Sequence, residues 1–135
     1  MALIVHKYGG TSMGSTERIR NVAKRVAKWA RAGHQMVVVP SAMSGETNRL
    51  LALAKELAPA KPSDDYSREL DMLAATGEQA SSALLAIALQ AEEMESVSYA
   101  GWRCPVHAAL VAGCRHHWAG GPVGAVQPTA GGWLK

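Results

Sequence analysis

Two short apolar runs, separated by a segment of helical periodicity, organise the first forty residues. The runs are residues 2–5 and 36–39, and such continuous runs are typical of buried strands. Between them, apolar residues recur at intervals of three and four, which predicts a helix from about Ser15 to Gly33. Its predicted core face comprises Ile19, Val22, Ala23, Val26, Ala27 and Ala30. This order predicts a βαβ unit with two parallel neighbouring strands, in a sheet covered on both faces.

The pattern continues as helices up to about residue 93. We predict helices over 47–57, 67–76 and 78–93, with Gly77 as a break between the last two, and a third strand over 97–100. In the last of these helices the predicted core positions are Ala83, Leu84, Ile87, Ala88 and Ala91. The fold class is therefore α/β.

Composition narrows the class of protein. A chain of 135 residues suits one domain, and its net charge of +3 comes from basic residues mixed with acids along helices. That pattern is typical of solvated helix faces, so we expect no nucleic-acid partner. No apolar run approaches the ~18 residues of a membrane span. Without a signal peptide at the N-terminus, the expected location is the cytoplasm, where the two cysteines stay reduced.

The last third of the chain has a different character. Glu95 is the last acidic residue, and glycines and histidines interrupt any sustained period after Trp102. Such a segment has little apolar surface with which to offset its conformational entropy. We expect residues 103–135 to form a poorly ordered tail, separate from residues 1–102.

The junction after the first strand carries the strongest chemical signal. Lys7, Tyr8, Gly9 and Gly10 follow the apolar run, and a helix begins shortly afterwards. Glycines allow close approach of backbone amides to a ligand, and a nearby ammonium and helix N-terminus favour an anion. The segment is not a standard P-loop, because Ser15 stands where that motif requires lysine. The segment has two possible interpretations: a phosphate-binding loop, or an ordinary turn between a strand and a helix.

Three motifs in order carry a family resemblance. They are Lys7-Tyr8-Gly9-Gly10-Thr11-Ser12, Ser41-Ala42-Met43-Ser44-Gly45-Glu46-Thr47-Asn48 and Gly77-Glu78-Gln79. Together they resemble the N-terminal part of aspartate kinase, over about residues 1–102. The resemblance implies part of an amino-acid-kinase (carbamate-kinase-like) fold, a mostly parallel sheet between helical layers. From Arg103 the chain departs from the family, and a shifted reading frame or a truncation would account for the divergent tail.

The resemblance also implies a reaction and a set of site residues. Aspartate kinases transfer the γ-phosphoryl group of ATP, with Mg²⁺, to the β-carboxylate of L-aspartate, and the complete enzyme is expected to be a homo-oligomer. The implied phosphate-binding residues are Lys7, Tyr8, Gly9 and Gly10, with Lys7 also catalytic. The implied substrate-binding residues are Ser41, Thr47 and Glu78. For Thr47 the alternative is helix capping, and for Glu78 it is stabilisation of a helix dipole. We expect the chain alone to be inactive, because the segments expected to bind the rest of ATP are missing.

Two further functions remain open from the sequence. Residue types that bind zinc cluster in the tail, where a four-ligand site would order a short segment. They are Cys104, His107, Cys114, His116 and His117. Their spacing is irregular and is equally explained by the biased composition, so no metal ligand is assigned. The other possibility is a non-catalytic half-domain that binds nucleotide or pairs with another chain.

Overall fold

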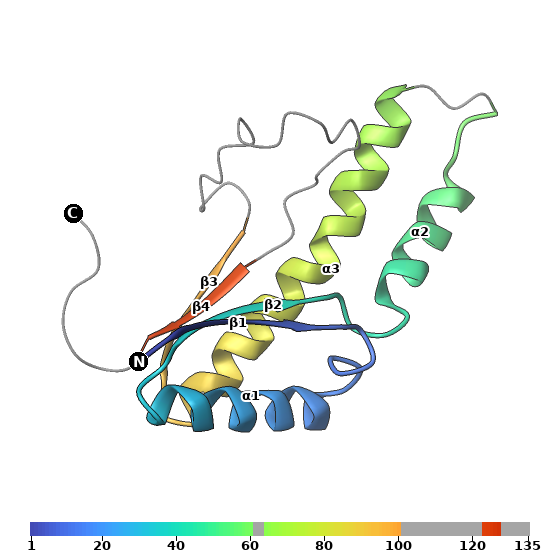
Figure 1. Ribbon diagram of the computed structural model, residues 1–135. Helices are drawn as coiled ribbons and strands as arrows, with labels where there is room; N and C mark the ends of the chain where they lie inside the picture. The colour runs from blue at the N-terminus through green and yellow to red at the C-terminus, as the bar shows by residue number, and fades with distance from the viewer. Residues whose placement is uncertain (61–63, 101–122, 128–135) are drawn as a thin grey trace.

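A parallel β1–α1–β2 unit begins the fold, as the sequence predicts. The computed structural model describes residues 1–60, 64–100 and the strand 123–127. Its elements are β1 (Leu3–Tyr8), α1 (Thr16–Arg31), β2 (Gln35–Pro40), α2 (Glu46–Glu56), α3 (Asp64–Ala91), β3 (Glu95–Tyr99) and β4 (Val123–Gln127) (Figure 1). β1 pairs with β2 in parallel, with Leu3 opposite Gln35 and Tyr8 opposite Pro40. The predicted βαβ unit is confirmed.

Helix α1 has the start and the core face that the sequence predicts. Ser15 is its N-cap, and the Ser15 hydroxyl accepts a hydrogen bond from the Arg18 amide at 3.2 Å. Every predicted core position of this helix is buried, namely Ile19, Val22, Ala23, Val26, Ala27 and Ala30. The apolar face thus fixes the rotation of α1 against the sheet.

The sheet contains a strand that the sequence pattern does not reveal. The strand order is β1-β2-β4-β3, and β4 is antiparallel to both of its neighbours. It follows that β1, β2 and β3 all run in one direction. β4 lies inside the segment that we expect to be a poorly ordered tail, and the sequence pattern did not predict this strand. The rest of that tail lies outside the described residues.

One face of the sheet packs against both α1 and α3. Its core cluster joins Tyr8 of β1 and Met36 and Val38 of β2 to residues of α1 and to Leu85 and Leu89 of α3. The opposite face carries exposed apolar side chains, with Leu3 63%, Val5 61% and Val97 55% exposed. We predicted a sheet covered on both faces, but the described helices that pack on it, α1 and α3, share one face.

Helix α3 is continuous where the sequence predicts a break. It runs from Asp64 to Ala91 through Gly77, so the predicted pair of helices is wrong. A Cβ at Gly77 would lie 2.9 Å from the Cβ of Ala42, which means that this glycine allows close packing against the segment after β2. The predicted core face is wrong at its large residues, because Leu84 and Ile87 are exposed whereas Leu85 and Leu89 are buried. Of the predicted positions, Ala88 does pack against the core. Because α3 is apolar on several sides, periodicity does not single out the buried one.

We expect Gly77→Ala to lower the free energy of unfolding by up to about 2 kcal/mol. The added methyl would press on a Cβ fixed to backbone, and overpacking of this kind costs roughly 1–3 kcal/mol, against a helix-propensity gain of about 1 kcal/mol. Urea unfolding of the chain measures the change. In an Ala42→Gly background the same substitution should be neutral or stabilising, and an equal loss in both backgrounds would contradict the proposed contact.

The length and apolar character of α3 conflict with our expectation that the chain contains no segment able to span a membrane. Over residues 65–91 the helix is long and apolar enough to cross a membrane, by length and composition only, and 28% of its most apolar 18-residue stretch is buried. The expectation that no apolar stretch reaches this length is corrected. Core helices of soluble proteins share these properties, and α3 packs against α1 and β3.

Candidate functional site

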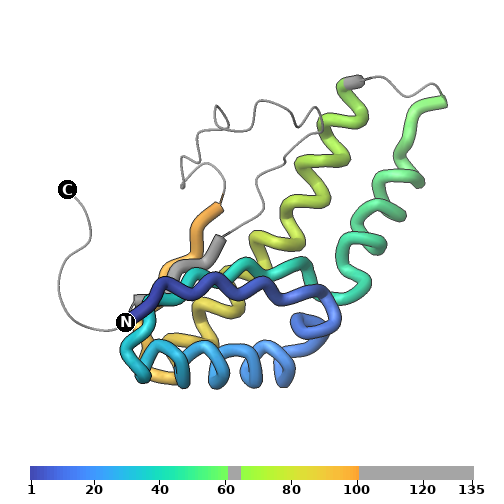
Figure 2. The backbone as a smooth tube through the Cα atoms, viewed as in Figure 1, coloured from blue at the N-terminus to red at the C-terminus, as the bar shows by residue number. Residues whose placement is uncertain are grey.

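The segments that follow β1 and β2 meet at one end of the sheet. In Figure 2 both strands run in the same direction and end beside the start of α2. The Ser41 amide donates a hydrogen bond to the Tyr8 carbonyl at 2.8 Å, which continues the pairing of the two strands. A Cβ at Gly10 would lie 3.1 Å from the Ala42 carbonyl oxygen, so the glycine loop packs directly on the second segment. The predicted phosphate loop and the predicted substrate loop are therefore adjacent.

Lys7 and Tyr8 point to opposite faces of the sheet. The Lys7 side chain is exposed, and the structure records no ion pair for it among the described residues. Tyr8 is 9% exposed and its ring faces α1, with its hydroxyl 3.3 Å from Nδ1 of His6. Burial raises the pKa of Tyr8, and the charge of Arg25 partly opposes this shift. Because the Tyr8 ring lies on the opposite face, only the backbone atoms of Tyr8 could contact a phosphate bound beside Lys7.

Glu78 lies in the middle of α3 and faces the segment after β2. Its Oε1 atom accepts a hydrogen bond from the Ala42 amide at 3.4 Å, a long bond, and the residue is half-buried. Within the described part of the chain, no cation forms a salt bridge with Glu78. The alternative that Glu78 only stabilises a helix N-terminus is wrong, because α3 begins at Asp64.

Thr47 lies in the first turn of α2, close to the same part of α3. Its Oγ1 atom is 3.8 Å from the position that a Cβ would take at Gly77. The N-cap of α2 is Gly45, in the left-handed region at φ 82°, so the alternative that Thr47 caps the helix is wrong. Ser41, Thr47 and Glu78 are thus grouped around the contact between Ala42 and Gly77.

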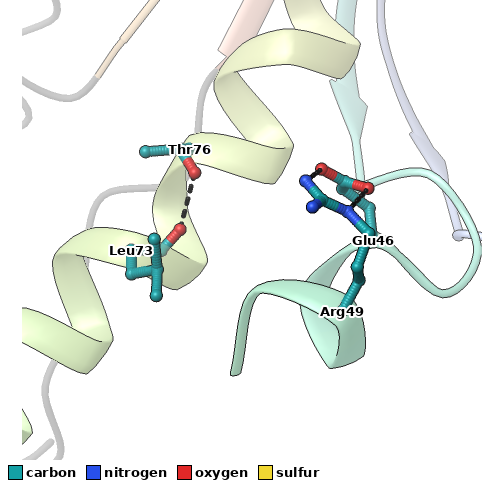
Figure 3. A network of polar contacts seen from close by, with 4 residues as sticks. All are labelled: Glu46, Arg49, Leu73 and Thr76. Carbon is teal, nitrogen blue, oxygen red and sulfur yellow. Dashed lines mark hydrogen bonds and ion pairs between the residues drawn. The ribbon is translucent and has the colours of Figure 1, made fainter. Parts of the chain in front are cut away.

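A second carboxylate in this region is neutralised locally. Glu46 accepts hydrogen bonds from the Arg49 guanidinium at 2.7 and 3.0 Å, in the first turn of α2 beside α3 (Figure 3). These bonds, together with the positive charge of Arg49, hold the pKa of Glu46 below its ordinary value. Sequence reasoning did not single out this pair, although its spacing of three residues on a helix is a recognisable signal.

No described group of three or more His, Cys, Asp or Glu side chains is arranged to hold a metal ion. The residues considered for a zinc site (Cys104, His107, Cys114, His116 and His117) lie outside the described part of the chain. The candidate site therefore consists of the glycine loop with Lys7, the segment after β2 and the middle of α3.

Comparison with known proteins gives the family. The model of the amino acid kinase family matches residues 2–119, so the chain belongs to this family. Within it, the chain is 54% identical over 101 residues to an aspartate kinase of Pseudomonas fluorescens, covering 75% of this chain and 24% of that protein. It is 47% identical over 113 residues to aspartokinase 2 of Bacillus subtilis, covering 84% of this chain and 27% of the relative.

A solved structure agrees with the sequence comparison. The crystal structure of aspartate kinase from Synechocystis matches with a TM-score of 0.61 and 47% sequence identity, over 67% of this chain and 15% of that chain. The predicted resemblance is confirmed for an N-terminal segment of the aspartate kinases. The chain spans about a quarter of the length of the curated relatives that it matches.

Proposed function

We propose that this chain is the N-terminal part of an aspartate kinase catalytic domain. The complete enzyme would transfer the γ-phosphoryl group of ATP to the β-carboxylate of L-aspartate, giving 4-phospho-L-aspartate, the first step toward lysine, threonine and methionine. The attacking group is a carboxylate and is already a nucleophile, so no general base is required. Catalysis then depends on alignment of two anions and on neutralisation of charge.

The observation that carries this proposal is the environment of Glu78. It is a half-buried carboxylate with one long backbone contact and no described salt bridge, adjacent to two hydroxyl-bearing residues, Ser41 and Thr47. A carboxylate binds an ammonium group, and hydroxyls donate to a carboxylate. Such a set suits an α-amino acid, with Glu78 on its α-ammonium group.

The glycine loop supplies donors for the phosphate end of Mg²⁺-ATP. The described residues suit that end of the nucleotide, because Lys7 is an unpaired cation within the described part and Gly9 and Gly10 leave the backbone accessible. In this proposal, Lys7 neutralises the negative charge that develops on the transferring phosphoryl group. The glycine amides donate hydrogen bonds to the phosphate oxygens. Mg²⁺ supplies further positive charge to the same oxygens when ATP is bound.

The organisation of the chain follows from the same proposal. We assign residues 1–102 to the kinase part and residues 103–135 to the divergent segment, and the family match continues into that segment as far as residue 119. The complete enzyme is a cytoplasmic homo-oligomer. Because only about a quarter of the relatives' length is present, we propose that the chain by itself binds L-aspartate without catalysing transfer.

We expect Thr47→Val to weaken L-aspartate binding to this chain about tenfold, the usual effect of losing one hydrogen bond to a charged group. Isothermal titration calorimetry measures the affinity. Thr76→Val is the matched control, because the exposed Thr76 hydroxyl donates only to the Leu73 carbonyl of α3, at 2.6 Å (Figure 3). Equal losses in both variants would contradict the assignment.

We expect the unmodified chain to show no aspartate kinase turnover. Coupled ADP release should stay below the ~1 s⁻¹ of ordinary enzymes, and turnover at that rate would contradict the expected inactivity.

A further inference from the structure

A small pocket lies on the α1 side of the sheet, away from Lys7. It has a volume of about 190 Å³ and is lined by Tyr8, Ser12, Arg18, Asn21, Val22 and Arg25. The three polar residues of α1 are spaced by three and four positions, so they form one stripe along the helix. The pocket therefore joins this stripe to the end of β1 and to the glycine loop.

The lining of the pocket carries hydrogen-bond donors and no acid. Two guanidinium groups, an amide and two hydroxyls can all donate. Elsewhere in the described chain, Arg49 and Arg68 form salt bridges with glutamates, whereas neither Arg18 nor Arg25 has a carboxylate partner there. Arg18 is anchored, because its Nη1 donates to the Thr11 carbonyl at 2.6 Å. The pocket thus places the positive charge of α1 beside the glycine loop.

We propose that this pocket binds a small dianionic oxyanion of the phosphate class, and that the bound anion ties the glycine loop to α1. Guanidinium groups favour such ligands because they donate two parallel hydrogen bonds. Pockets for drug-sized ligands occupy about 300–1,000 Å³, so 190 Å³ suits an anion of phosphate size and not a whole nucleotide. The ligand would contact Tyr8 and Ser12, which flank Gly9 and Gly10.

The test is a titration of the isotope-labelled chain with inorganic phosphate, followed by NMR at the Asn21 side-chain amide and the Ser12 backbone amide. We expect saturable shifts at both positions, and no such shifts with sodium chloride of equal ionic strength. Arg18→Gln and Arg25→Gln should each weaken binding about tenfold. Arg20→Gln removes the same charge from α1 outside the pocket and should leave the affinity within about twofold.

Two other variants separate this site from the proposed kinase site. Lys7→Ala and Glu78→Gln should leave the phosphate-induced shifts of Asn21 unchanged, even if the kinase assignment fails. Loss of these shifts in Lys7→Ala with retention in both arginine variants would overturn the inference, because the phosphate would then occupy the Lys7 side. Equal binding of succinate would overturn the assignment to the phosphate class, and so would the absence of saturable shifts.

Discussion

Replacing Lys7 by alanine is expected to lower kcat about 10²–10³-fold in a complete enzyme, the typical effect of losing one electrostatic donor to the transition state. The suitable protein is a hybrid in which residues 1–100 of this chain precede the remainder of the P. fluorescens aspartate kinase. Negative charge on the transferring group is redistributed most at the transition state, so a cation there acts mainly on the rate. Steady-state kinetics with varied aspartate would measure the effect.

The Lys7 prediction has a matched control in Lys55→Ala. Lys55 is an exposed lysine near the end of α2, remote in sequence from the glycine loop, and its loss should leave kcat unchanged. The KM for aspartate should change little in the Lys7 variant. A normal kcat in Lys7→Ala would show that the exposed face of β1 is not the face used for phosphoryl transfer.

Glu78→Gln should have the opposite kinetic signature in the same hybrid. The substrate ammonium is present both before and during transfer, so removing its charged partner weakens binding of the ground state and the transition state alike. We expect the aspartate KM to rise about 10- to 100-fold, as for the loss of a hydrogen bond to a charged group, with a smaller drop in kcat. Saturation kinetics on the purified hybrid separate these two parameters.

Two further variants check the Glu78 assignment. Glu56→Gln alters an exposed carboxylate at the end of α2 and should leave the aspartate KM unchanged. Glu78→Asp keeps the charge on a shorter side chain and should recover part of the affinity. An unchanged KM in Glu78→Gln would rule out Glu78 as the ammonium-binding residue and leave its contact with the Ala42 amide as a structural one.

The sequence pattern predicted the first half of the fold because its capping and apolar residues match the helix bounds and the buried faces that packing produces there. The α1 segment has a clear cap, a single apolar face and a glycine just beyond its end, and each was found as expected. Gly77 shows where this reasoning fails. A glycine within a helical pattern indicates a break unless another backbone approaches closely, and the approach of Ala42 is a long-range contact that no local window contains.

The residues of the candidate site could be predicted from the sequence, but their positions relative to the helix ends could not. The three motifs named the residues, yet the capping alternative for Thr47 and the dipole alternative for Glu78 needed the helix bounds to be excluded. The pocket beside Tyr8 was missed altogether. The spacing of Arg18, Asn21 and Arg25 is visible in the sequence, but only the packing of α1 under β1 places them next to the glycine loop.

The position of β4 has a consequence for the order of folding. The fourth strand in sequence lies between the second and the third in the sheet, where Val38 pairs with Gly124. During synthesis, β1, α1 and β2 can dock as soon as they emerge, because their contacts are local. β3 cannot pair until β4 is made, so the edge of β2 stays open until residues 123–127 have left the ribosome. A strand edge left open in this way is a site for mispairing with another nascent chain.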